Sequence, residues 1–135
     1  MKSNPIAASS NSQYLFNHEI GADDDGSALA AHIESSPIDI SDGEKFGFIR
    51  RLVPDISFLT TPDTASKEVT FTLKAEDFPG TGFTQNYAST VTADETQNHV
   101  RIRGRGLGLR IESANQGVTW RLGSPSVDIR QDGRR

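Results

Sequence analysis

The side chains of this sequence that could do chemistry are carboxylates, three histidines and a concentration of arginines near the C-terminus. The acidic run at 23–25 could suit calcium, and Glu34 follows it at a distance that invites comparison with an EF-hand. An EF-hand loop needs glycine at its sixth position, which here is Ala28, and a helix on each side. We therefore expect residues 21–26 to form a turn and not a metal site.

The remaining candidates for catalysis lack the spacing that catalysis needs. His18, His32 and His99 match no metal-binding spacing, and the chain has no cysteine to assist them. Glycoside hydrolysis needs two carboxyl groups close in space, whereas most acids here fall in expected turns. There is no G-x-S-x-G motif for a serine nucleophile. The sequence predicts no enzymatic activity, no metal and no cofactor.

Charge is distributed unevenly along the chain. Residues 101–135 hold eight arginines and three acids, a net +5, and residues 1–100 carry a net −9, which together give −4. Such blocks can pair within the fold, pair between copies, or address an anionic partner. The overall acidity favours contacts between copies over nucleic-acid binding.

The segment Arg-Gly-Arg-Gly-Leu-Gly at 103–108 has two interpretations. A dinucleotide-binding loop needs G-x-G-x-x-G between a strand and a helix, whereas this segment runs G-x-G-x-G between two expected strands. Of the two interpretations, a hairpin and a phosphate-binding loop, we favour the hairpin, whose glycines would let the backbone bend. Its arginines would then be solvated or paired with acidic neighbours.

The elements that must position these arginines are strands. Four C-terminal runs alternate apolar and polar residues, which predicts one antiparallel sheet with a buried face and an opposite face rich in arginine. Trp120 is expected in the core. The four runs lie at 100–103, 107–112, 118–122 and 127–130.

Upstream, short turn-bounded runs predict further strands. For 28–34 we prefer a strand over a short helix. Residues 45–53 are apolar on both parities, which predicts a strand covered on both faces, and Gly47 within it suggests close backbone approach or a bulge. The other expected strands are 14–20, 37–40, 55–59, 69–73 and, weakly, 85–94.

These runs predict an all-β fold, an antiparallel β-sandwich or partly open barrel of about nine short strands. Residues 14–135 would form a single domain, preceded by a flexible arm at 1–13 rich in serine, asparagine and alanine. At 135 residues the chain can bury one core without disulfides. No apolar run approaches the roughly 18 residues that would span a membrane.

Three blocks of the sequence resemble a known family. They are GEKFGFIRRLVPDISF at 43–58, VTFTLKAEDFPG at 69–80 and VRIRGRGLGLRIESANQGVTWRLGSPSVDIRQDGRR at 100–135. They are similar to the C-terminal part of tail nozzle proteins of short-tailed bacteriophages (podoviruses), also called tail hub or packaged-DNA stabilisation proteins. HEIGADDDGSALAAHIES resembles the segment before these blocks. Family proteins are several times longer, so the chain is either a detached domain or the same domain in another virion position.

The resemblance implies a virion structural protein of the tail, assembled in the cytoplasm of the bacterial host. Copies would form a ring, usually six-fold, below the portal and adaptor, and would help to retain or gate the packaged genome. Contact with other tail proteins and transient contact with phage DNA are further implied. The expected interface residues are Arg50, Arg51, Arg103, Arg105, Arg110, Arg121, Arg134 and Arg135.

A second hypothesis is a receptor- or glycan-binding module at the tail tip or on tail appendages, since β-sandwiches often carry such sites on loops. The contact would then be the threonine- and asparagine-rich stretch 82–98, with Phe83 and Tyr87. Nucleic-acid binding through the basic end is a third hypothesis, and it predicts strongly salt-dependent affinity. Hydrolase activity ranks last.

Overall fold

The computed structural model describes residues 4–59 and 66–133. These residues contain fourteen strands, one 3-10 turn (η1, Ser41–Gly43) and no α-helix. The strands are β1 (Ile6–Ala8), β2 (Leu15–Asn17), β3 (Asp23–Asp24), β4 (Ser27–Ala28), β5 (Ala31–Glu34), β6 (Ile38–Asp39), β7 (Gly47–Val53), β8 (Ile56–Leu59), β9 (Glu68–Glu76), β10 (Gln85–Thr92), β11 (Asn98–Gly104), β12 (Gly106–Ser113), β13 (Thr119–Leu122) and β14 (Ser126–Gln131). The strands exceed the expected number partly because β1 lies in the segment expected as an arm and β3 in the segment expected as a turn.

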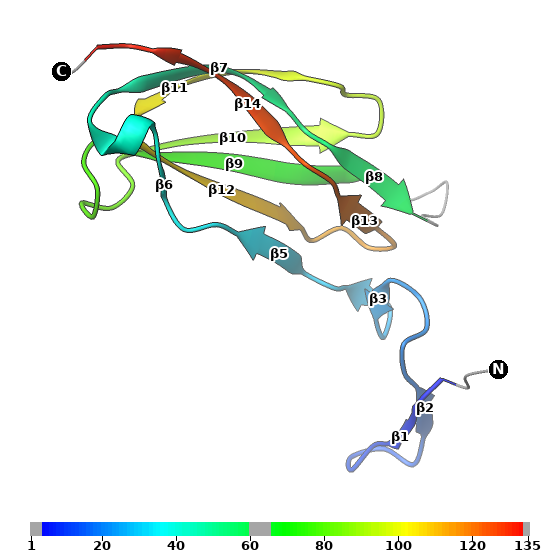
Figure 1. The fold of residues 1–135 in the computed structure, drawn as a ribbon. Coiled ribbons are helices and arrows are strands. Elements are labelled where there is room, and N and C mark those ends of the chain that lie inside the picture. Colours follow the sequence, from blue (N-terminus) through cyan, green and yellow to red (C-terminus); the bar gives the residue numbers. More distant parts are fainter. Residues whose placement is uncertain (1–3, 60–65, 134–135) are drawn as a thin grey trace.

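Two antiparallel sheets lie face to face and form a β-sandwich (Figure 1). The larger sheet has the order β10-β9-β12-β5, with β6 also paired to β12, and the smaller has the order β11-β7-β14. Residues 28–34 contribute strands and no helix, as expected. The all-β sandwich predicted from the sequence is confirmed.

The core lies between these sheets. It is built from alternating inward residues, because successive side chains of a strand point to opposite faces of its sheet. Phe71 in β9 and Ile49 in β7 are completely buried. Trp120 packs against the core, as expected, and its Nε1 donates a hydrogen bond to Ser113 Oγ at 2.8 Å. The core residues are Ile49, Leu52, Val69, Phe71, Leu73, Ala75, Val91, Val100, Ile102 and Ile111.

The four C-terminal strands form, but the prediction that they share one sheet was wrong. β12 belongs to the larger sheet, β11 and β14 to the smaller one, and β13 pairs with β8. The cause is long-range pairing, since β12 takes its neighbours β9 and β5 from far upstream in the chain. Their arginines are therefore divided among three sheets.

The prediction that 45–53 is covered on both faces was also wrong. In β7, Ile49 and Leu52 are buried while Arg50 and Arg51 between them are exposed. The pairing with β14 skips Arg50, which marks a β-bulge in β7. The extra residue changes the phase of alternation, so apolar residues occupy both parities although only one face is buried. Close approach at Gly47 is confirmed, because a Cβ there would lie 2.8 Å from Ile129 Cγ2.

The segment 103–108 is a corner between the two sheets and not the expected hairpin. Only Arg105 separates β11 from β12, and these strands belong to different sheets. The backbone N–H of Arg105 donates a hydrogen bond to the Glu76 carbonyl at 2.8 Å. The flanking glycines permit this contact, because a Cβ at Gly104 would lie 2.9 Å from the same carbonyl oxygen.

The N-terminal extension, which we define as residues 4–30, holds two small hairpins (Figure 1). β1 pairs with β2, and β3 with β4. The turn expected at 21–26 is present: Asp25 and Gly26 both have positive φ, as a two-residue hairpin turn requires. The boundary expected after residue 13 falls in the loop between β1 and β2, so residues on both sides of it belong to one hairpin.

Candidate assembly surface

The outer face of the smaller sheet collects most of the exposed arginines, and we call it the arginine face. Residues opposite each other on neighbouring strands share a face. Arg103, Phe48 and Arg130 form one such row across β11, β7 and β14, and His99, Arg51 and Asp128 form another. The face carries five arginines against the two aspartates at its β14 side. These arginines are Arg50, Arg51, Arg101, Arg103 and Arg130.

The bulge in β7 allows two consecutive arginines to reach this face. Arg50 Nε donates to Asp128 Oδ2 at 2.7 Å, and Arg51 lies 3.8 Å from the same oxygen. The hydrogen bond from Arg50 is the main reason that the pKa of Asp128 lies below its usual value. One carboxylate therefore contacts two guanidinium groups, and the net charge at the centre of the face remains positive.

The other end of the face is ordered by stacking. Arg103 lies over the Phe46 ring, with 4.0 Å between the guanidinium carbon and the ring centroid, and its Nε donates to Asp132 Oδ2 at 2.5 Å. Arg105 lies against Phe46 at 4.7 Å and Phe78 at 4.6 Å. Cation–π contacts of this kind hold a guanidinium in one place. Arg105 is thus a half-buried packing residue of the corner.

A hollow of about 400 Å³ opens in the arginine face beside β10. It is lined by Phe48 and Tyr87 together with Arg50 of β7 and Arg101 of β11. It lies at the second bulge, where β11 has two residues, Val100 and Arg101, opposite Arg50. The hollow thus combines aromatic and cationic lining residues.

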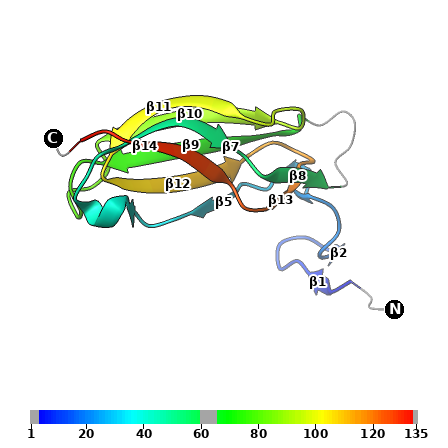
Figure 2. The same cartoon turned by 45° about the horizontal axis from the view of Figure 1, so that its top comes forward.

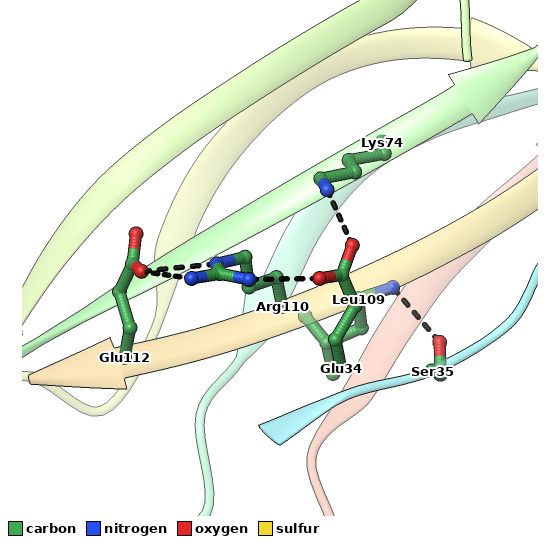
Figure 3. Close-up of polar contacts among 6 residues, drawn as sticks. All are labelled: Glu34, Ser35, Lys74, Leu109, Arg110 and Glu112. Atoms are coloured by element: carbon green, nitrogen blue, oxygen red, sulfur yellow. Dashed lines mark hydrogen bonds and ion pairs between the residues drawn. The ribbon is translucent and has the colours of Figure 1, made fainter. Parts of the chain in front are cut away.

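Arg110 lies elsewhere, on the outer face of the larger sheet (Figure 3). It donates to Glu34 Oε2 at 2.8 Å and to Glu112 Oε2 at 2.7 Å, and Lys74 pairs with the other oxygen of Glu34. Two cations and two anions thus form a neutral network. The hydrogen bond from Lys74, followed by that from Arg110, lowers the pKa of Glu34.

Replacing Glu34 by glutamine is expected to reduce stability at neutral pH and to have almost no effect in strong acid. A carboxyl whose folded pKa is depressed contributes stability above its unfolded pKa, and loses it as the pH falls through the folded pKa. The effect should be small, because the group is solvent-accessible. Thermal unfolding followed by circular dichroism at both pH values measures it. Glu44→Gln, at an exposed residue, is the control, and an equal loss in both variants would contradict the prediction.

The structure brings together only part of the expected interface. Arg50, Arg51 and Arg103 share the arginine face, whereas Arg105 and Arg110 make the intramolecular contacts given above. Arg121 is exposed on β13. Arg134 and Arg135 lie outside the described residues.

Arg101 and Arg130 were not among the expected interface residues, but the pairing of β11 and β14 with β7 adds both to the face. Neither makes a hydrogen bond or a close ion pair within the part of the chain that the structure describes. Their alternation with Val100 and Ile129 was visible in the sequence. The missing information was that both strands flank β7.

The aromatic residues of the glycan-binding hypothesis make contacts within the domain. Phe83 covers Gly108, where an added Cβ would lie 2.5 Å from the ring, and Lys74 stands 5.5 Å from the ring centroid. The hydroxyl of Tyr87 donates to the His99 carbonyl at 2.7 Å. Both side chains therefore help to join or cover strands.

Across 4–59 and 66–133 no group of three or more His, Asp or Glu side chains is placed to hold a metal ion. Nor does this part of the chain contain a helix of the length and apolarity needed to cross a bilayer. No family model matches the sequence, and a search of curated proteins gives no match.

Proposed function

We propose that this protein is a structural subunit of a short bacteriophage tail, either a nozzle or hub subunit or a detached nozzle domain. It acts by binding and not by catalysis. Copies assemble into a ring through protein–protein contacts, meet the portal, adaptor or other tail proteins, and help to retain the packaged genome. The sequence resemblance supports the tail assignment, and a six-fold ring is its expected symmetry.

One structural observation carries the assembly part of the proposal. The N-terminal extension leaves large apolar side chains uncovered, with Ile6 65% and Leu15 75% exposed. A two-stranded hairpin such as β1-β2 has marginal stability in water on its own. Contiguous exposed apolar surface commonly marks an interaction site. The extension is therefore the part of this chain that most needs a partner.

Cryo-electron microscopy of the intact tail of a virion that carries this chain tests the proposal. We expect density for the sandwich in a closed symmetric ring on the tail axis, in contact with the portal or adaptor. Density only in peripheral appendages would contradict the axial role and would favour receptor binding. Absence of the chain from the tail would overturn the proposal entirely.

A further inference from the structure

We propose that the N-terminal extension of one copy docks on the arginine face of a second copy, so that subunits associate head to tail. This inference rests on the proposed self-assembly and names the two surfaces that meet.

The two surfaces are opposite in charge. The extension, residues 4–30, contains four carboxylates, all within 19–25, and no lysine or arginine. The arginine face presents five arginines against two aspartates. Arg101 and Arg130 have no hydrogen-bonded carboxylate among the described residues. The complementary charge for this face is thus present in the same chain.

The apolar groups of the extension and of the arginine face also complement each other. Ile20 is 58% exposed and follows Glu19 directly, within the acidic stretch. The hollow in the arginine face is lined by Phe48 and Tyr87 and by Arg50 and Arg101. An isoleucine flanked by carboxylates is the kind of segment that such a hollow accepts, because the side chain meets the rings while the carboxylates meet the guanidinium groups.

The β3-β4 hairpin of the extension is bound to the sandwich, whereas β1 and β2 are exposed. Asp23 Oδ1 accepts a hydrogen bond from the Gly117 N–H at 2.5 Å, and Gln116 donates to the Gly26 carbonyl at 2.7 Å. These contacts fix the β3-β4 hairpin to the loop between β12 and β13. The ordering cost of docking is lower for a segment that is already anchored.

The direction of the extension makes the contact intermolecular. In Figures 1 and 2, β1 and β2 project beyond the side of the sandwich that carries β5, away from β7 and β11. The extension therefore faces away from the arginine face of its own copy. Contact between two different patches is heterologous, and such an interface generates a ring when its rotation closes.

Sedimentation velocity on the full chain tests the contact by charge reversal. We expect the face variant Arg101→Glu/Arg130→Glu and the extension variant Glu19→Lys/Asp24→Lys each to weaken self-association by about ten-fold or more. The chain that carries all four substitutions should regain association, because the reversed charges again complement each other. The matched control Lys45→Glu/Lys67→Glu changes the charge equally outside the face and should associate like the wild type.

Several outcomes would overturn the inference. They are a wild-type chain that stays monomeric at about 100 μM, reversals that act no more strongly than the control, and a fourfold variant with no recovery. Loss of salt-sensitive binding to duplex DNA in the face variant, with self-association unchanged, would assign the face to nucleic acid and also overturn it. Thermal unfolding verifies that each variant is folded.

These results can be separated from the test of the proposed function. Tail density in an axial ring combined with ineffective charge reversals would refute this contact alone. Effective reversals combined with density only in peripheral appendages would refute the axial role and leave the contact standing.

Discussion

Replacing Phe71 by alanine is expected to lower the free energy of unfolding by about 3–5 kcal/mol. Phe71 is completely buried in β9, an inner strand that pairs with both β10 and β12. Its removal takes away buried apolar surface and leaves a cavity between two sheets that cannot fully close around it. A domain of this size has a total stability of roughly 5–15 kcal/mol, so the variant should lose a large part of it.

Chemical denaturation measures the effect, and Phe78→Ala is the matched control. Phe78 is 52% exposed and stacks on Arg105 at the corner, so its loss should cost far less. Equal losses in the two variants would contradict the position of the core. The indole of Trp120 packs against this core and provides a fluorescence signal for the transition.

Alanine at position 104 is expected to destabilise the domain by about 1–3 kcal/mol through overpacking. A Cβ on Gly104 would lie 2.8 Å from Ala75 Cβ and 2.9 Å from the Glu76 carbonyl oxygen. That oxygen accepts the hydrogen bond of Arg105 and cannot move without disturbing the corner. The backbone of β9 would therefore have to shift.

A double-mutant cycle identifies the cause of that loss. Ala75→Gly removes one of the two atoms that the new methyl group would strike, so the Ala75→Gly/Gly104→Ala chain should lose less stability than the sum of the single variants. Strict additivity would show that the contact with Ala75 does not contribute. Thermal unfolding of the four proteins provides the comparison.

Local sequence patterns, including alternation and turn residues, were sufficient to predict where the sandwich strands lie. β9 alternates strictly, with Val69, Phe71 and Leu73 buried, and its position follows directly from the sequence. Short turn-bounded segments also indicated that 28–34 would be extended. Strand existence depends mainly on neighbouring residues, which a single sequence displays.

The arrangement of the strands depends on pairings that a single sequence does not display. β12 pairs with β5 and β9, so Arg110 meets Glu34 across a long separation in the chain. The bulge at Arg50 inverts the parity of β7, which made a one-sided strand resemble one covered on both faces. The sequence therefore predicted that the candidate surface would be rich in arginine. Which arginines belong to it depends on the long-range register of the strands.

The smaller sheet also has a consequence for synthesis of the chain on the ribosome. β7 ends at Val53, whereas its two neighbours begin at Asn98 and Ser126. During translation both hydrogen-bonding edges of β7 therefore stay unpaired until β11 and β14 have been synthesised. A nascent β-strand with unpaired edges can pair with another chain. Topologies dominated by such distant pairings fold slowly. We expect the yield of native protein to depend on how well this interval is protected.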